Sequence, residues 1–198
     1  MIVSALFVRR DSVYKSLPDV DAWDIDRDAR NWPGGTPIVA HPPCAQWGTL
    51  SHMARHNPAE KSLGPLAVRW IRQWGGVLEH PVRSKLWPHM GLPAGPIPDE
   101  HGGWTLPVSQ RWWGHRADKQ TRLYIVGCAP RDIPPMPLEI GRATHICAGG
   151  AAATAEEAKR RRQCLPEFRR PSISHAEREH TPRAFAEWLV ELARRCQK

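Results

Sequence analysis

Two reactive side chains follow short apolar runs that read as buried strands. Cys44 comes after the run 37–40 and a proline pair, and Glu79 directly follows the run 77–78. A cysteine in a stiff loop at a strand end can be a nucleophile if its thiolate is stabilised, or it can be a small packed thiol. A carboxylate at the end of an apolar strand is costly to bury without a partner. It can accept from an amino group or, when protonated, hold a ring nitrogen of a base.

Other side chains could support either residue. His41, Arg116 or a nearby helix N-terminus could stabilise a Cys44 thiolate, whereas Glu79 could simply form an ion pair with Arg83 or Arg116. In open α/β sheets, ligands bind beyond the carboxyl ends of the strands. We therefore expect Cys44 and Glu79 to face one crevice.

The elements that must position these residues indicate an α/β fold. Strands are predicted at 2–8, 20–25, 37–40, 77–78 and 123–127, and helices at 65–74 and 182–196. Strand, helix and strand over 37–78 form a βαβ unit, which is normally parallel. We expect a Rossmann-like, mostly parallel sheet with flanking helices and long proline-rich loops. We predict that residues 1–198 form one α/β domain, with an irregular basic insertion at about 129–180 and a closing helix at 182–196.

The net charge indicates a class of partner, and the cysteine content indicates a compartment. The 28 basic and 20 acidic residues give a formal charge of +8, which favours a polyanion such as nucleic acid; a basic protein with no such partner is the alternative. Clusters at 159–162 and 169–170 could grip phosphates or be solvated helix surface. Five irregularly spaced cysteines fit reduced thiols in the cytoplasm. No apolar run suits a membrane span, so no membrane partner is expected; the oligomeric state stays open.

Aromatic and metal-ligating side chains are further candidates for parts of a site. Three of the ten tryptophans lie beside the candidate segments: Trp47, Trp112 and Trp113. Each could stack on a base or pack in the core. Four possible zinc ligands are spread over the second half of the chain: Cys128, His145, Cys147 and Cys164. Because the chain has no Cys-x-x-Cys pair, a metal site is not expected.

The order of these segments resembles the cytosine-5 DNA methyltransferases. Segment 40–44, Ala-His-Pro-Pro-Cys, looks like their Pro-Cys nucleophile motif, and segment 78–81, Leu-Glu-His-Pro, resembles their Glu-Asn-Val motif. Segment 114–127 is similar to their Gln-x-Arg-x-Arg segment and the strand after it. Thr181 and the helix beyond it resemble the helix that closes the family's fold. The resemblance implies a methyltransferase-type scaffold and covers about half of the chain.

The resemblance also implies a covalent mechanism. The family's cysteine adds to carbon 6 of a pyrimidine, which makes carbon 5 a nucleophile, and its glutamate binds ring nitrogen 3 and the exocyclic amine. By position, Cys44 is the nucleophile, Glu79 the base-binding acid and Arg122 the second arginine; these three are the expected catalytic residues. Gln120 replaces the first arginine and His80 replaces the asparagine. Substrate binding is assigned to a further set: His41, Pro43, Trp47, His80, Arg116 and Gln120.

The cofactor segment departs from the family pattern. The resemblance implies S-adenosylmethionine, bound near Phe7, Arg9 and Arg10, with Asp24 in place of the acid that holds its ribose. Where the family has Phe-x-Gly-x-Gly, Phe7 is followed by Val-Arg-Arg. Their side chains would crowd the cofactor and would suit a phosphate better, unless they form a solvated basic turn. We expect Phe7 and Asp24 at the edge of the cavity that holds the catalytic residues. The family's target-recognition domain has little room at 129–180.

Three functions remain open from the sequence. The first is a pyrimidine-modifying transferase that acts on DNA or a pyrimidine nucleotide, with methyl transfer as the default reaction. The second is a non-catalytic nucleic-acid-binding protein on a degenerate methyltransferase scaffold. The third is a nucleotide-level pyrimidine hydroxymethylase or hypermodification enzyme. By analogy with the family, a phage or mobile-element modification system is a plausible setting.

Overall fold

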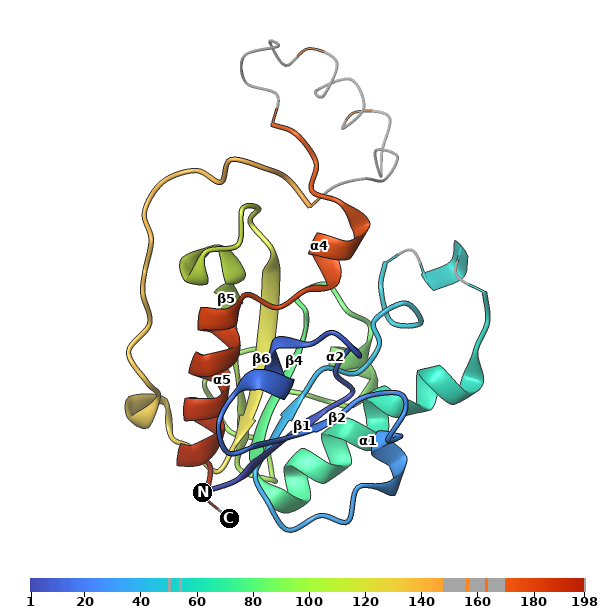
Figure 1. Cartoon of the computed structure of the whole chain (residues 1–198), viewed down its shortest axis with the longest axis vertical. Coiled ribbons are helices and arrows are strands. Elements are labelled where there is room, and N and C mark those ends of the chain that lie inside the picture. The colour runs from blue at the N-terminus through green and yellow to red at the C-terminus, as the bar shows by residue number, and fades with distance from the viewer. Residues whose placement is uncertain (50, 54, 148–155, 157–162, 164–169, 198) are drawn as a thin grey trace.

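The chain folds around one six-stranded sheet with the strand order β2-β1-β3-β4-β6-β5 (Figure 1). A computed structural model describes residues 1–49, 51–53, 55–147, 156, 163 and 170–197. The strands are β1 (Val3–Leu6), β2 (Val20–Trp23), β3 (Ile38–Ala40), β4 (Gly76–Pro81), β5 (Gly103–Ser109) and β6 (Gln120–Val126). The described α-helices are α1 (Pro58–Trp74), α2 (Leu86–His89), α4 (His175–Glu179) and α5 (Arg183–Arg195). Short 3-10 helices are η1 (Val13–Ser16), η2 (Ala29–Asn31), η3 (Ser51–Met53), η4 (Gln110–Trp113) and η5 (Pro130–Asp132). The expected α/β class is confirmed.

The sheet is mixed, which corrects the expectation of a mostly parallel one. β1 pairs in parallel with β2 and β3, and β3 pairs in parallel with β4, so the expected βαβ unit through α1 is present. β6 is antiparallel to both β4 and β5. The link from β5 to β6 is residues 110–119 and begins with η4. Such a short link suits antiparallel neighbours, because a parallel pair needs a crossover of a dozen or more residues.

Two helices cover the two faces of the sheet (Figure 1). Because successive side chains of a strand point to opposite faces, Val77 packs with the α5 cluster around Phe185, whereas Leu78 packs with the α1 cluster around Ile71. All four of these side chains are fully buried. The predicted apolar stripe of the last helix, which includes Leu189, is therefore confirmed as core.

The helix predicted at 65–74 begins earlier, at Pro58. Asn57 caps it, since its side chain accepts from the backbone N–H of Glu60 at 3.2 Å, and a proline suits the first turn. Pro65 lies inside the helix, although a proline there leaves the carbonyl four residues before it without a donor. The Trp47 indole N–H donates to that carbonyl, of Lys61, at 3.1 Å. A tertiary contact thus satisfies the acceptor that the proline leaves free.

One further prediction concerns where a strand ends, and others concern residues outside the described part of the chain. Glu79 does not follow its strand but lies inside β4, which continues to Pro81. The basic cluster at 159–162, Arg169 and Cys164 fall outside the described residues. Within the part of the chain that the structure describes, no helix is long and apolar enough to cross a membrane.

Gly76 is where the sheet tolerates a side chain least. Its φ is +123°, and a Cβ there would overlap the backbone of Ile38 on β3. We expect Gly76→Ala to lower the free energy of unfolding by more than about 3 kcal/mol, from backbone strain plus overpacking. Gly91 is the matched control: its φ is +60° but no atom lies within 4 Å of a Cβ, so Gly91→Ala should cost only about 1–2 kcal/mol. Urea unfolding of both variants checks this, and equal losses would contradict it.

Candidate active site

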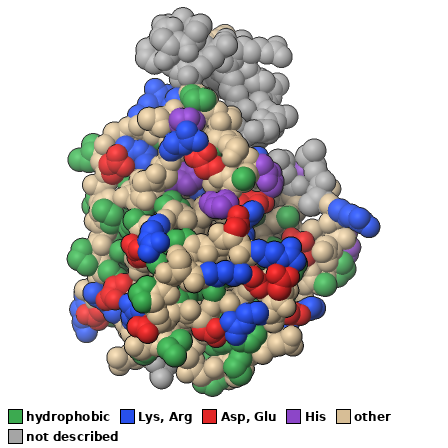
Figure 2. Space-filling view, viewed as in Figure 1, with side chains coloured by type: hydrophobic (Ala, Val, Ile, Leu, Met, Phe, Trp, Pro, Cys, Tyr) green, Lys and Arg blue, Asp and Glu red, His purple; other side chains and the backbone are tan. Residues whose placement is uncertain are grey.

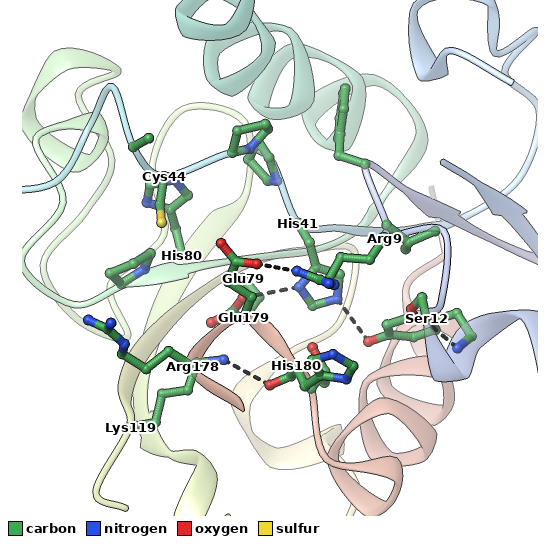
Figure 3. A pocket seen from close by; sticks show the side chains of 18 of the residues that line it. Arg9, Ser12, His41, Cys44, Glu79, His80, Lys119, Arg178, Glu179 and His180 are labelled. Carbon is green, nitrogen blue, oxygen red and sulfur yellow. Dashed lines mark hydrogen bonds and ion pairs between the residues drawn. The ribbon is translucent and has the colours of Figure 1, made fainter. Parts of the chain in front are cut away.

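A cavity of about 380 Å³ opens at the carboxyl ends of the central strands. Phe7 follows β1, His41 and Cys44 follow β3, and Glu79 lies on β4; all four line the cavity. Figure 3 shows the Cys44 sulfur and the Glu79 carboxylate pointing into it from different segments. The cavity lies within the size range of small-molecule sites. The expected meeting of Cys44 and Glu79 is therefore present in the structure.

The Glu79 carboxylate is the most heavily bonded group in the cavity. His41 Nδ1 contacts Oε2 at 3.0 Å, and Gln110 Nε2 donates to Oε1 at 3.2 Å. The Thr121 hydroxyl also donates to Oε1. The second ring nitrogen of His41, Nε2, lies 2.9 Å from the hydroxyl of the buried Tyr14. A chain of polar groups thus runs from Tyr14 through His41 to Glu79.

These contacts keep Glu79 ionised. Burial by itself would raise the pKa of its carboxyl, but the hydrogen bond and charge of His41, the charge of Lys119 and the Thr121 hydroxyl outweigh burial and hold the pKa at about 2. Burial and the Glu79 charge raise the pKa of Tyr14 well above its usual value. Tyr14 therefore keeps its proton and Glu79 does not.

Cys44 carries a protonated thiol in the free protein. The residue is exposed at the mouth of the cavity, while burial of the sulfur against the cavity wall and the charge of Glu79 raise the pKa of the thiol. The thiolate is the nucleophilic form of cysteine. A reaction at Cys44 therefore needs a group that takes its proton.

His80 also lines the cavity and is 1% exposed. Neither of its ring nitrogens has a hydrogen-bond partner among the described residues. Burial lowers its pKa to about 4, against weaker opposing effects of the Glu79 charge and the Pro43 backbone. The imidazole is therefore neutral at neutral pH, with one N–H to donate and one nitrogen that can accept.

Basic side chains from distant segments form one rim of the cavity (Figure 3). Lys119, just before β6, donates to the carbonyl of His180 at 3.1 Å. Arg178 of α4 has a buried Nε with no partner among the described residues. Arg9 forms ion pairs with Asp11 and Glu179. Because Arg9 is engaged in this way, Lys119 and Arg178 are the two cations of this rim that an anionic group such as a phosphate could contact.

Arg122 does not join Cys44 and Glu79, contrary to expectation. In the β4–β6 pairing Arg122 lies opposite His80, while Leu123 lies opposite Glu79. Side chains alternate along a strand, so Arg122 points to the other face, where its guanidinium lies 5.3 Å from the Trp87 ring centroid. It is not among the side chains that line the cavity. The polar group that β6 supplies to Glu79 is Thr121.

Three expected substrate-binding residues also lie away from the cavity lining. Trp47 is 3% exposed and packs in the α1 core, where Pro65 gives it a hydrogen-bond acceptor. Arg116 is exposed and bonds Glu177 through two nitrogens at 2.8 and 2.5 Å. Gln120 is exposed at the start of β6. His41, Pro43 and His80, from the same set, do line the cavity.

A second cavity of about 360 Å³ adjoins the first and shares Phe7 and Pro43 with it. Phe7 has a φ of +60°, a left-handed conformation usual for glycine. Asp24, just after β2, is 4% exposed and lines this cavity rather than the first. Its carboxylate accepts from Lys15 at 2.5 Å and from two backbone N–H groups. Ile25 beside it is 73% exposed.

The two arginines after Phe7 lie outside the second cavity, whereas Val8 lines it. Arg10 turns outward to Asp26, with contacts of 2.8 and 2.7 Å, and lines neither cavity. Arg9 lines the first cavity but not the second. Both guanidinium groups are engaged with carboxylates, so neither stands free for a phosphate.

Within the described residues, no group of three or more His, Cys, Asp and Glu side chains could hold a metal ion. Cys128 is buried at the end of β6, and His145 contacts Thr144 and Arg116. Cys164 lies outside the described residues.

The side chains that complete the Glu79 network were not predicted from the sequence. Tyr14, Gln110 and Thr121 come from η1, η4 and β6. Thr121 could have been found once β4 and β6 were known to be neighbours, because it lies opposite Pro81 in their register. Tyr14 and Gln110 carry no sequence signal, since loops far apart in the chain bring them to the site.

The ionised Glu79 predicts a pH-dependent stability. A carboxyl whose pKa is lower in the folded state stabilises the fold above its unfolded pKa, and this contribution is lost as the pH falls through the folded pKa. With a folded pKa of about 2 and an ordinary value of 4.5, the stability difference between wild type and Glu79→Gln should shrink by on the order of 3 kcal/mol between pH 7 and pH 2. Urea unfolding at several pH values measures it.

Glu100→Gln is the control for this experiment, because Glu100 has an 85% exposed side chain whose partner is its neighbour His101. It should show no comparable change with pH. A wild-type advantage over Glu79→Gln that stays constant from pH 7 to pH 2 would contradict an ionised Glu79.

Comparisons with known proteins leave the family of this chain open. No protein-family model matches it, and neither a curated protein nor a solved structure matches it at a significant level.

Proposed function

We propose that the chain is a pyrimidine-modifying transferase that acts on DNA or on a nucleotide, with Cys44 as its nucleophile. The observation that carries the proposal is the cavity in which Cys44, Glu79 and His80 meet at the carboxyl edge of the sheet. It combines a thiol, a fixed carboxylate and an unpaired imidazole, which suit covalent activation of a planar polar ring. The two segments that supply these groups are those that resemble the cytosine-5 DNA methyltransferases.

The proposed first step is addition of Cys44 to the base. The sulfur lone pair forms a bond to carbon 6 of the pyrimidine, and the electron pair of the carbon 5–carbon 6 double bond moves to carbon 5. The thiol proton leaves to solvent at the mouth of the cavity, where Cys44 is exposed. Carbon 5 then takes an electrophile, and loss of the carbon 5 proton and of the sulfur restores the ring. Methyl transfer is the default outcome.

The rim of the cavity supports a phosphorylated substrate. Lys119 and Arg178 lie on the same rim, and the Arg178 Nε has no partner among the described residues. Guanidinium groups bind phosphate oxygens well. A nucleotide, or one phosphate of a DNA strand beside an extruded base, would be held there while its base enters the cavity.

The methyl donor in this proposal is S-adenosylmethionine, held in the second cavity. It adjoins the Cys44 cavity through Phe7 and Pro43, Ile25 offers an exposed apolar surface, and Asp24 offers a buried carboxylate. When bound, this cofactor supplies an electrophilic methyl group. The left-handed Phe7 makes the turn after β1 without the glycine that the family uses, and the chain's own task there is to orient the donor toward carbon 5.

A non-catalytic nucleic-acid-binding protein is the second candidate. The protonated Cys44 thiol and the net charge of +8 favour it. On the face seen in Figure 2, however, basic side chains are interspersed with acidic ones and histidines gather in the upper part, so no broad basic surface stands out there. If the chain is such a binding protein, its affinity for DNA should fall as the salt concentration rises. Cys44→Ala should then leave that affinity unchanged.

Binding of the cofactor can be measured without any reaction. We expect Ile25→Asp to weaken S-adenosylmethionine binding by roughly tenfold or more, because it places a charge against the apolar part of the ligand. Isothermal titration calorimetry measures the affinity. Ile97→Asp is the matched control, since Ile97 is 79% exposed and lines neither cavity. Equal affinity in both variants, or no binding by the wild type, would contradict the assignment.

Covalent trapping tests the reaction itself. The protein is incubated, with and without S-adenosylmethionine, with nucleotides and single-stranded oligonucleotides that carry 5-fluorocytosine or 5-fluorouracil, because fluorine at carbon 5 blocks release of the sulfur. Intact mass should show an adduct that Cys44→Ser abolishes. Cys147→Ser, at a free cysteine outside the cavity lining, should keep it. Salt-dependent DNA binding without an adduct to either base would favour the binding protein instead.

A further inference from the structure

The hydrogen bonds around Glu79 restrict which pyrimidine this site can hold. We propose that the substrate base carries a hydrogen on ring nitrogen 3 and a carbonyl at carbon 4, so that it is a uracil-type base and not cytosine. The inference rests on the proposed function and goes beyond it by naming the substrate class.

The hydrogen bonds that reach the Glu79 carboxylate are all donated to it. The Tyr14 hydroxyl has the His41 Nε2 as its partner among the described residues, and it is buried. An ionised carboxylate can only accept, so His41 Nδ1 carries a hydrogen and donates to Glu79 Oε2 at 3.0 Å. The Glu79 carboxylate is therefore the hydrogen-bond acceptor in this network.

Glu79 keeps an acceptor site for a ligand. A carboxylate has about four acceptor sites. His41 occupies one on Oε2, Gln110 occupies one on Oε1, and the Thr121 hydroxyl contacts both Oε1 and the His80 carbonyl. At least one acceptor site on Oε2 therefore remains, next to an anionic charge. A ligand group that fits this site must donate a hydrogen.

The two pyrimidine types differ at this point. A uracil-type ring presents N3–H to such an acceptor, whereas cytosine presents the lone pair of an unprotonated nitrogen 3. The cytosine amine could take the free site, but its nitrogen 3 would then face the carboxylate charge without a hydrogen. Burial makes such an unpaired acceptor expensive. Glu79 therefore discriminates against cytosine unless a proton is brought with it.

The unpaired groups near Glu79 also suit a uracil-type ring. Both carbonyls beside its N3–H need donors. His80, the next residue of β4, lines the same cavity, and neither of its ring nitrogens has a hydrogen-bond partner among the described residues. A neutral imidazole has one N–H, which could donate to a ring carbonyl. One fixed acceptor and one such donor suit a ring that presents N–H and carbonyl side by side.

Equilibrium binding tests the inference without requiring a reaction. Deoxyuridine and deoxycytidine monophosphates are titrated into the Cys44→Ser protein by calorimetry in near-neutral buffer. Because one buried acceptor is left unpaired in the cytosine complex, the uracil nucleotide should bind roughly tenfold to a hundredfold more tightly. The cytosine affinity should improve in more acidic buffer, where nitrogen 3 gains a proton. Equal or tighter binding of the cytosine nucleotide near neutrality would overturn the inference.

Changing the ligand instead of the protein tests the inference without affecting folding. The nucleotide of 3-methyluracil lacks the N3–H, and its affinity should fall by at least tenfold relative to deoxyuridine monophosphate. In the Cys44→Ser background, Glu79→Gln should reduce the preference for uracil, because an amide can also donate. Glu100→Gln, at an 85% exposed side chain, is the matched control and should retain it. A 3-methyl nucleotide that binds as tightly as its parent would overturn the inference.

The binding and trapping results separate this inference from the proposed function. Preferential uracil binding without an adduct in the wild-type protein would support the inference and contradict the transferase. An adduct that forms with 5-fluorocytosine, together with tighter cytosine binding, would support the transferase and overturn the inference. Failure to bind either nucleotide, together with failure to bind or trap oligonucleotides that carry either base, would overturn both.

Discussion

The site depends on one constraint: a negative charge is held inside the carboxyl edge of the sheet. A buried carboxylate is tolerated only when donors compensate for the water it has lost. At Glu79 the donors are His41, Gln110 and Thr121, and Tyr14 orients the first of them. The 3-10 helix η1, the loop after β3, η4 and β6 must all be in place for this set to form. Packing of the fold and chemistry of the site are therefore coupled through one side chain.

The ends of β3 and β4 set the positions of the two main groups. β4 carries Glu79 on one face and His80 on the other, so a cavity that wraps the edge of the sheet reaches both. The proline pair after β3 limits the path of the chain toward Cys44. The thiol reaches the same cavity without being part of the Glu79 network. This division suits a site in which one group fixes the ring while another attacks it.

The same constraint links the proposed function to the choice of base. A carboxylate that compensates for its burial by accepting three hydrogen bonds has little freedom to act as an acid. The matching glutamate in the family that the sequence resembles is expected to hold ring nitrogen 3 and an exocyclic amine. Here the surrounding donors restrict Glu79 to accepting, and the proposed preference for a uracil-type base follows from those neighbours and not from the glutamate alone.

The sequence by itself determined the α/β class, the βαβ unit of β3, α1 and β4, and the closing helix α5. It also determined that Cys44 and Glu79 line one cavity, because strand ends and helical stripes are local patterns. Only the tertiary structure decided the antiparallel β5–β6 pair, the early start of α1 through Pro65, and the fate of Arg122. Strand alternation and register, which depend on which strands are neighbours, turned Arg122 away and brought Thr121 to Glu79. Tyr14 and Gln110 joined the site through contacts between distant segments, which no local pattern encodes.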